Sequence, residues 1–375
     1  MKFVSTIKAL HQNRNRAFSS HEPRGEIPHL MEKILDRVTS LRNWWSIYNG
    51  NGEVKESSTE KLLLLDLRTL ESYEQRRLAS FRLLVVPFPV QHLKERSYEL
   101  PARHVEFSIL VEKDFVKDAM ILLLGIKHQS RKRPGKPWKV ESILLDGPEL
   151  WEQAAELGIV SDLDKSIDSP TFPLPRLWQP DPMVETIILS HLKNCPSQNG
   201  SLQVWDLASG AGRDVAFLAE ELLAGGNPYQ VWGFDHRYNE KEINTTQSFW
   251  ERRGVGHLTK CVCMDLSNWK TIVTSLATDQ VAALFCVRFW KPDLVSDIAK
   301  SSKDLRPGTL FGISHFCKPY DGAPWNFDHP SEKTVLERTQ LRDLFQSQGW
   351  EILHDDITLD SDHGRTMIQF VAKTK

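Results

Sequence analysis

The fold of the second half of this chain is decided by residues 204–212, which read Val-Trp-Asp-Leu-Ala-Ser-Gly-Ala-Gly. An apolar strand ends in the carboxylate of Asp206, and a turn with two glycines leads into a helical pattern that starts at Arg213. Glycine lets backbone N–H groups come close to a ligand because it carries no Cβ. The start of the helix adds partial positive charge. The stretch therefore predicts a nucleotide-type cofactor site.

Strand and helix patterns alternate regularly from this stretch to the end of the chain. Alternation of this kind predicts a parallel sheet with helices on both faces. The last two strands are joined by a connection too short for a crossover, so they are expected to form an antiparallel pair. The seven expected strands span 203–208, 230–235, 258–264, 281–289, 309–316, 350–359 and 366–373, with the last intervening helix near 333–348.

This arrangement, over about residues 176–375, resembles the class I S-adenosylmethionine-dependent methyltransferases. Their first motif, D-x-G-x-G-x-G, corresponds to residues 206–212, with Ala208 in place of the first glycine. The resemblance implies a Rossmann-like methyltransferase sheet that closes with an antiparallel hairpin. It also implies that S-adenosyl-L-methionine is the cofactor, with Asp206 at the motif and Gly210 and Gly212 nearest the ligand.

The same resemblance assigns roles to the ends of the next two strands. Asp235 ends the second strand, where the family has an acidic residue that accepts hydrogen bonds from both ribose hydroxyls. Asp265 and Leu266 follow the third strand, where the family places an acidic residue against the adenine amino group. These motifs occur in the expected order, each at the end of a strand.

Three other interpretations of these motifs remain open. Glycine and aspartate are common in ordinary turns. A dinucleotide-binding domain would need a third glycine for close helix–strand packing, where this chain has Val215. The third alternative is a non-catalytic binding or regulatory protein, built from two degenerate enzyme folds.

Candidate residues for the methyl acceptor follow strands four and five, because ligands of open α/β sheets bind at the carboxyl ends of strands. Arg288 could hold an acidic acceptor, or form a surface salt bridge. His315 could act as a base, or be a histidine with a purely structural role. Tyr320 could contact substrate or pack in a lid. The Asn/Asp-Pro-Pro-aromatic sequence of nucleic-acid and protein-amide methyltransferases is absent after strand four, so a small-molecule acceptor is favoured.

The first half contains a second, smaller α/β pattern, with strands expected at 62–67, 83–86, 107–111 and 140–145. Asp66-Leu67-Arg68 followed by Tyr73, together with residues 144–151 ending in Trp151, resembles the opening and closing segments of rhodanese-like domains. That chemistry needs a cysteine persulfide, and no cysteine precedes Cys195. We therefore expect a non-catalytic rhodanese-like domain for interaction or regulation, with a protein partner as one use.

The expected organisation has four parts. Residues 1–21 contain no acid and four basic residues, which fits a mitochondrial targeting leader or the disordered tail of a cytoplasmic protein. Residues 22–160 form the rhodanese-like domain, 161–179 a proline-containing linker, and 180–375 the methyltransferase domain.

Composition limits the remaining classes. The net charge of −2 leaves no whole-chain signal for nucleic acid. The basic run at 127–136 is interpreted as a solvated loop, with RNA binding and nuclear localisation as alternatives. No apolar run reaches the roughly 18 residues that a membrane span needs. The five cysteines lack the spacing of a disulfide framework, which favours an intracellular protein, and no metal site is expected.

Overall fold

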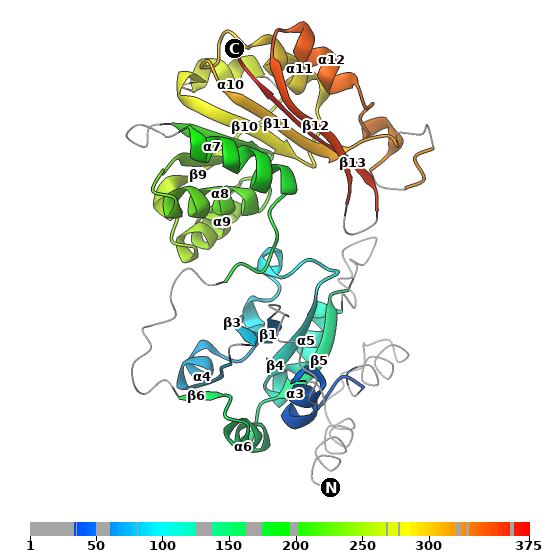
Figure 1. Ribbon diagram of the computed structural model, residues 1–375. Helices are drawn as coiled ribbons and strands as arrows, with labels where there is room; N and C mark the ends of the chain where they lie inside the picture. Colours follow the sequence, from blue (N-terminus) through cyan, green and yellow to red (C-terminus); the bar gives the residue numbers. More distant parts are fainter. Residues whose placement is uncertain are drawn as a thin grey trace, which may run out of the picture. The chain divides into compact units, whose positions relative to one another are not determined.

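The computed structural model divides into two compact units, Met1–Ser169 and Pro170–Lys375 (Figure 1). The division falls inside the segment 161–179 that the sequence marks as a linker. The predicted leader, the basic run and Tyr320 lie outside the described residues. The structure describes residues 34, 36–49, 61–80, 82–124, 137–162, 175–195, 202–267, 269–276, 278–319, 324–327, 330–360 and 364–375.

The first unit is built on a four-stranded parallel sheet in the order β3-β1-β4-β5. Its central strands are apolar and mostly buried, as expected when helices cover both faces of a parallel sheet. The four strands are β1 (Leu62–Asp66), β3 (Leu83–Pro87), β4 (Glu106–Val111) and β5 (Lys139–Leu145). The helices are α3 (Leu41–Asn49), α4 (Leu70–Gln75), α5 (Val116–Leu123) and α6 (Pro148–Glu156), with short 3-10 turns η2 (Val90–His92), η3 (Ser97–Glu99) and η4 (Lys113–Phe115).

The first unit also contains two short strands that the sequence pattern does not predict. They are β2 (Arg76–Leu78) and β6 (Val160–Asp162), which pair antiparallel in a separate small sheet. Each has only three residues, too few for an alternating pattern to be recognised.

The two segments of the first unit that the sequence likens to rhodanese-like domains lie close together in the structure. The Arg68 guanidinium binds both carboxylate oxygens of buried Asp66, at 2.9 and 2.6 Å. The same guanidinium lies 4.7 Å from the ring centroid of Trp151. The Trp151 indole N–H in turn donates to Asp146 at 2.8 Å. The opening and closing motifs are thus joined by a buried ion pair and an aromatic contact.

The second unit is built on a seven-stranded sheet in the order β12-β13-β11-β10-β7-β8-β9. The first five strands in the sequence pair in parallel, whereas β13 is antiparallel to both β11 and β12. The seven strands are β7 (Gln203–Leu207), β8 (Gln230–Asp235), β9 (Thr259–Cys263), β10 (Val281–Val287), β11 (Leu310–Phe316), β12 (Glu351–Leu359) and β13 (Thr366–Lys373).

Helices cover both faces of this sheet (Figure 1). One face packs its main apolar core against α10 (Trp269–Ser275), α11 (Pro292–Lys300) and α12 (Gln340–Ser347). The other is covered by the π-helical segment η5 (Val184–Ile188), which continues into α7 (Leu189–Asn194), and by α8 (Arg213–Ala224) and α9 (Glu240–Arg252). Short 3-10 turns are η7 (Gly256–Leu258), η8 (Thr278–Gln280) and η9 (Glu332–Thr334).

Two predicted elements are shorter than expected, each for a local reason. Strand β10 ends at Val287 because Arg288 adopts a left-handed backbone, with φ 53°. The helix expected over 333–348 begins only at Gln340, because Leu336 forms a β-bridge with Cys317.

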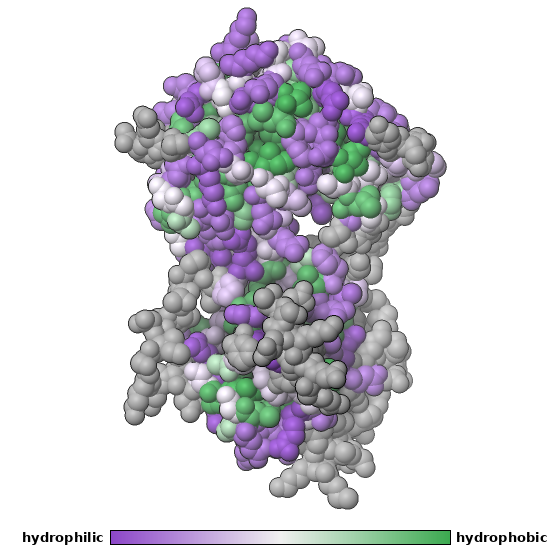
Figure 2. Space-filling view, in the orientation of Figure 1, coloured by the Kyte–Doolittle hydropathy of each residue, from purple (hydrophilic) through white to green (hydrophobic). Residues whose placement is uncertain are grey.

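Exposed apolar residues are scattered. The face shown in Figure 2 mixes hydrophilic and hydrophobic residues over the second unit, without one dominant apolar area. Single exposed apolar side chains such as Leu223 and Leu359 are ordinary on protein surfaces. Within the described part of the chain, no helix has the length and apolar character to cross a membrane.

The turn between β7 and α8 depends on close packing beneath Gly212. Gly212 has φ 69°, and the Trp250 indole N–H donates to its carbonyl oxygen at 2.9 Å. A Cβ on Gly212 would lie 2.6 Å from the Trp250 ring. Glycine is therefore required here both by the backbone angle and by the fully buried tryptophan below it.

We predict that Gly212→Ala lowers the free energy of unfolding by about 2–4 kcal/mol, because it adds a steric clash to a left-handed backbone. Urea denaturation measures this change. Gly226→Ala is the matched control, since Gly226 has the same φ of 69° and nothing within 4 Å of the added Cβ. It should cost only about 1 kcal/mol. Equal losses in the two variants would show that the contact with Trp250 is unimportant.

Candidate functional site

The candidate site lies where the order of the parallel strands reverses. The chain continues from β7 to β8 on one side, whereas β10 pairs with β7 on the other. Ala208 and Arg288 follow the carboxyl ends of β7 and β10, with φ 70° and 53°. No other non-glycine residue among those described has a positive φ. Ligands of open α/β sheets bind at such a reversal, and strained backbone gathers at functional sites.

Hydrogen bonds hold the turn after β7 against the end of β8. The Ser209 N–H donates to the Phe234 carbonyl at 2.9 Å, and the Gly210 N–H donates to Asp235 at 3.1 Å. The Ser209 hydroxyl also lies 2.7 Å from the hydroxyl of buried Tyr238. The turn is thus fixed before any ligand arrives, which lowers the entropic cost of binding.

Asp235 ends β8 with a nearly inaccessible carboxylate that Arg237 encloses. Arg237 donates from its backbone and its guanidinium, at 2.9 to 3.1 Å. Burial raises the pKa of this carboxyl, but these hydrogen bonds and the Arg237 charge outweigh burial and leave the pKa below its ordinary value. Asp235 is therefore ionised at neutral pH. The Arg237 side chain is 65% exposed, so it could move into solvent if a ligand hydroxyl took its place.

Asp206 ends β7 with a deeply buried carboxyl group. It is 2% exposed, and its Oδ1 atom has no hydrogen-bond partner among the described residues. Burial raises the pKa of Asp206 well above its ordinary range. The carboxylates of Asp214, Asp235 and Asp181 raise it further. An unpaired buried carboxyl of this kind is stabilised as an anion only when positive charge comes close.

Two further carboxylates, Asp181 and Asp214, belong to the site although sequence reasoning did not assign them to it. Asp181 begins the helix before β7. It accepts from the Met183 N–H at 3.0 Å and from the Ser314 hydroxyl at 2.8 Å. Its own N–H donates to Asp214 at 3.0 Å. The helix before β7, the helix after it and β11 are thereby linked through one acidic cluster.

Burial changes the pKa values of Asp181 and Asp214. Burial raises the pKa of Asp181, and it raises that of Asp214 to about 6. The positive charge of Arg288 opposes both shifts. We call Asp181, Asp206, Asp214 and Asp235 the acidic cluster. Arg213, Arg237 and Arg288 lie close enough to lower the pKa of individual members.

The two described candidates for contact with the methyl acceptor, Arg288 and His315, differ in exposure. Arg288 is exposed, and its guanidinium carbon lies 5.9 Å from the Phe316 ring centroid. His315 is buried on β11, and its Nε2 atom lies 2.9 Å from the Thr334 carbonyl oxygen. Side chains alternate along a strand, so His315 lies on the opposite face of the sheet from the Ser314 hydroxyl that binds Asp181. Burial lowers the pKa of His315, which keeps its ring neutral.

The residues predicted to meet the adenine differ in accessibility. Asp265 is exposed after β9 and accepts from the backbone and hydroxyl of Ser267. These hydrogen bonds lower its pKa. Leu266 is 4% exposed and its side chain belongs to the core, so only its backbone could face a ligand. No cluster of three or more metal-ligating side chains occurs in the described part of the chain.

Comparison with known proteins finds similarity at the level of solved structures. Neither a protein-family model nor a curated protein matches the chain. The [4+2]-cyclase SpnF is 14% identical, with a TM-score of 0.38, over 50% of this chain and 80% of its own.

Methyltransferases also occur among the similar structures. The 1,6-didemethyltoxoflavin-N1-methyltransferase of Burkholderia thailandensis, with bound S-adenosylhomocysteine, is 16% identical over 52% of this chain and 77% of its own, at a TM-score of 0.36. The geranyl diphosphate C-methyltransferase of Streptomyces coelicolor is 11% identical over 51% and 81%, at a TM-score of 0.37. Similarity of this extent leaves the function to be argued from the residues of this chain.

We predict that Asp214→Asn stabilises the ligand-free protein at pH 7 by about 1–2 kcal/mol, and by much less near pH 4.5. The folded-state pKa of Asp214 is about 6, above the ordinary 3.8, so folding favours its protonated form. The stability due to this group is present at low pH and is lost as the pH rises from about 4 through 6. Asparagine keeps the oxygen that accepts from Asp181 and cannot ionise. Urea denaturation at both pH values measures the difference.

The control for that prediction is Asp279→Asn, which changes an exposed aspartate of η8. It should shift stability by no more than about 0.5 kcal/mol at either pH. A stability difference between Asp214→Asn and the unmodified protein that stays constant with pH would contradict the assigned pKa.

We also predict that Ala208→Gly raises the free energy of unfolding by about 0.5–1 kcal/mol. A left-handed backbone costs alanine about 1–2 kcal/mol, and the extra entropy of glycine in the unfolded chain offsets part of the gain. Ala211→Gly in the same turn is the control, since Ala211 has no positive φ, and it should stabilise nothing. If both substitutions destabilise the protein alike, the backbone at residue 208 carries no strain.

Proposed function

We propose that this chain is an S-adenosylmethionine-dependent methyltransferase that acts on a small-molecule acceptor. The proposal rests chiefly on one observation. Four carboxyl groups lie close to the strand reversal, and one of them, buried Asp206, has an oxygen without a hydrogen-bond partner among the described residues. S-adenosylmethionine carries a sulfonium and an ammonium group against one carboxylate, so its net charge is positive. A dinucleotide carries an anionic pyrophosphate, which this acidic cluster would repel.

The residues present fit such a cofactor. The unpaired oxygen of Asp206 would accept a hydrogen bond from the cationic part of the cofactor. Asp235 would accept hydrogen bonds from the ribose hydroxyls in place of those from Arg237. The exposed carboxylate of Asp265 would face the adenine amino group. The bound cofactor supplies a methyl group that is already activated by the positive sulfur. The chain then has to orient the two reactants in line and exclude water, which contributes most of the rate in a reaction of this type.

The acceptor class is inferred from the ends of β10 and β11. Arg288 offers a cation there, and Phe316, Trp325 and Phe327 form a cluster of aromatic rings. Aromatic packing beside an exposed arginine suits a small molecule that carries an acidic group. The sequence after β10, Arg-Phe-Trp at 288–290, lacks the motif of amide and base-amine methylation.

For the first unit we propose a rhodanese-like domain without sulfur transfer. Its support is the contact between the two motifs, in which Arg68 joins Asp66 to Trp151. The turn after β4 is η4, Lys113–Phe115, and offers no thiol. A role in interaction or regulation, and a mitochondrial or cytoplasmic location, complete the proposal.

The cofactor assignment is tested by isothermal titration calorimetry with S-adenosylmethionine, S-adenosylhomocysteine and NAD. We expect the first two to bind and NAD not to bind. Between pH 5 and 7.5 the affinity should rise more for S-adenosylmethionine than for S-adenosylhomocysteine. Only the former carries the sulfonium, and Asp214, with its pKa raised to about 6, ionises over this range. Tight binding of NAD, with no binding of S-adenosylmethionine or S-adenosylhomocysteine, would refute the assignment.

Asp235→Asn tests the site itself. Loss of a charged acceptor should weaken S-adenosylmethionine by about 10- to 100-fold, while Asp279→Asn leaves its affinity unchanged. Incubating the protein and a methyl-labelled donor with a cell extract separates catalysis from mere binding: label in the small-molecule fraction supports the enzyme. Cofactor binding with no labelled product would favour the non-catalytic alternative.

A further inference from the structure

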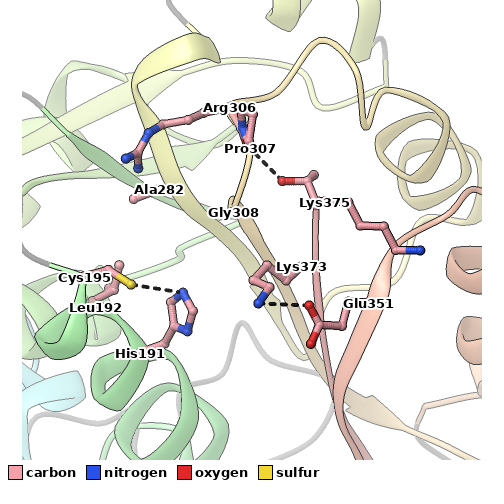
Figure 3. A pocket seen from close by; sticks show the side chains of 11 residues that line it. His191, Leu192, Cys195, Ala282, Arg306, Pro307, Gly308, Glu351, Lys373 and Lys375 are labelled. Carbon is pink, nitrogen blue, oxygen red and sulfur yellow. Dashed lines mark hydrogen bonds and ion pairs between the residues drawn. The ribbon is translucent and has the colours of Figure 1, made fainter.

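A separate cavity opens at the other end of the second unit's sheet (Figure 3). Its volume is about 440 Å³, within the usual range for small-molecule sites. It lies at the amino ends of β10 and β11, whereas the acidic cluster lies at their carboxyl ends. The walls of the cavity come from α7, the turn before β11 and the hairpin of β12 and β13. The lining residues are His191, Leu192, Cys195, Ala282, Arg306, Pro307, Gly308, Glu351, Lys373, Thr374 and Lys375.

The charged groups of this cavity are mainly positive. Glu351 is the single acidic residue among its described lining residues, and it is paired with Lys373 at 2.9 Å. The Arg306 guanidinium has no hydrogen bond or ion pair within the described part of the chain. Figure 3 shows it extending over Ala282. A cation without a partner at the edge of a cavity is a ready site for an anionic ligand.

The position of Arg306 is fixed by its backbone. The Thr374 hydroxyl donates to the Arg306 carbonyl oxygen at 2.8 Å, and the Gly308 N–H donates to the Thr374 carbonyl at 3.1 Å. These hydrogen bonds tie the turn before β11 to the end of β13. The cavity wall that carries Arg306 is therefore formed in advance.

His191 gives the cavity a neutral hydrogen-bonding group opposite Lys373 (Figure 3). Burial lowers the pKa of His191, and the charge of Lys373 lowers it further. Its Nε2 atom lies 3.6 Å from the Cys195 sulfur, which is exposed. A ligand held between Arg306 and Lys373 would lie beside this thiol, so the thiol can report on its presence.

We propose that this cavity is a second binding site, for a small anion that bears carboxylate or phosphate groups. Arg306 would bind the anionic group through two N–H donors. Lys373 would contact the ligand while it stays paired with Glu351. His191 would add a hydrogen bond. The proposal does not depend on the identity of the cofactor at the acidic cluster.

The test uses the full chain with citrate and inorganic pyrophosphate as separate probes, at an ionic strength matched with KCl. Calorimetry should show saturable binding of at least one probe, and the preferred one distinguishes carboxylate from phosphate ligands. Arg306→Gln should weaken that probe tenfold or more. Lys270→Gln is the matched control: it removes one exposed positive charge of α10, outside the cavity, and should leave binding unchanged.

Alkylation of cysteines by iodoacetamide gives an independent readout in the unmodified protein. Cys195 and Cys263 are both exposed, and only Cys195 lines the cavity. The bound probe should slow alkylation of Cys195 several-fold and leave Cys263 unaffected, as peptide mapping by mass spectrometry would show. The proposal is overturned if neither probe saturates at matched ionic strength, if the two variants bind alike, or if both thiols are protected equally.

Discussion

The second unit is organised around a buried carboxyl group, one oxygen of which has no hydrogen-bond partner among the described residues. Leaving an ionised carboxylate unpaired in a protein interior costs several kcal/mol, so such a group becomes neutral or awaits a cation. Asp206 is in this position at the end of β7, with Asp181 and Asp214 close enough to raise its pKa further. The strained turn, the capping of the preceding helix and the ion pair at Asp235 are all arranged around it.

The first unit offers an internal contrast. Asp66 also ends a buried parallel strand, and it is fully inaccessible. Arg68, two residues later, neutralises it through two hydrogen bonds. Asp235 likewise accepts two hydrogen bonds from the guanidinium of Arg237, which also follows it by two residues. Asp206 has no such arginine. The two local pairs differ in exposure: the Arg68 side chain is buried, whereas that of Arg237 is exposed and could leave Asp235 to a ligand.

Much of the architecture follows from the sequence because strands and turns are encoded locally. Each of the seven strands of the second unit lies within two residues of its predicted bounds, since apolar runs bounded by polar residues specify buried parallel strands. The glycine turn is equally local. What sequence alone could not provide are contacts between distant residues. Examples are the bridge from Leu336 to Cys317, which shortens a helix, and the bond from Asp181 to Asp214.

The departure of Ala208 from the family pattern acquires a physical meaning in the structure. The φ of 70° at residue 208 favours glycine because of the backbone angle alone. Alanine therefore costs some stability here, but its methyl group does not block the site. Gly212 is different, because Trp250 fills the space that a Cβ would need. A substitution that is tolerated at the first position would therefore not be tolerated at the last.

The two ends of this sheet carry opposite charge, and one helix joins them. Asp181 precedes the segment η5–α7, and His191 and Cys195 lie at its far end, roughly 20 Å away at 1.5 Å per residue. That exceeds the Debye length of about 8–10 Å at physiological salt, so charges at the two ends are screened from one another. Any influence of one end on the other would have to pass through the helix itself, whose π-helical turn is the kind of irregularity that often marks functional segments.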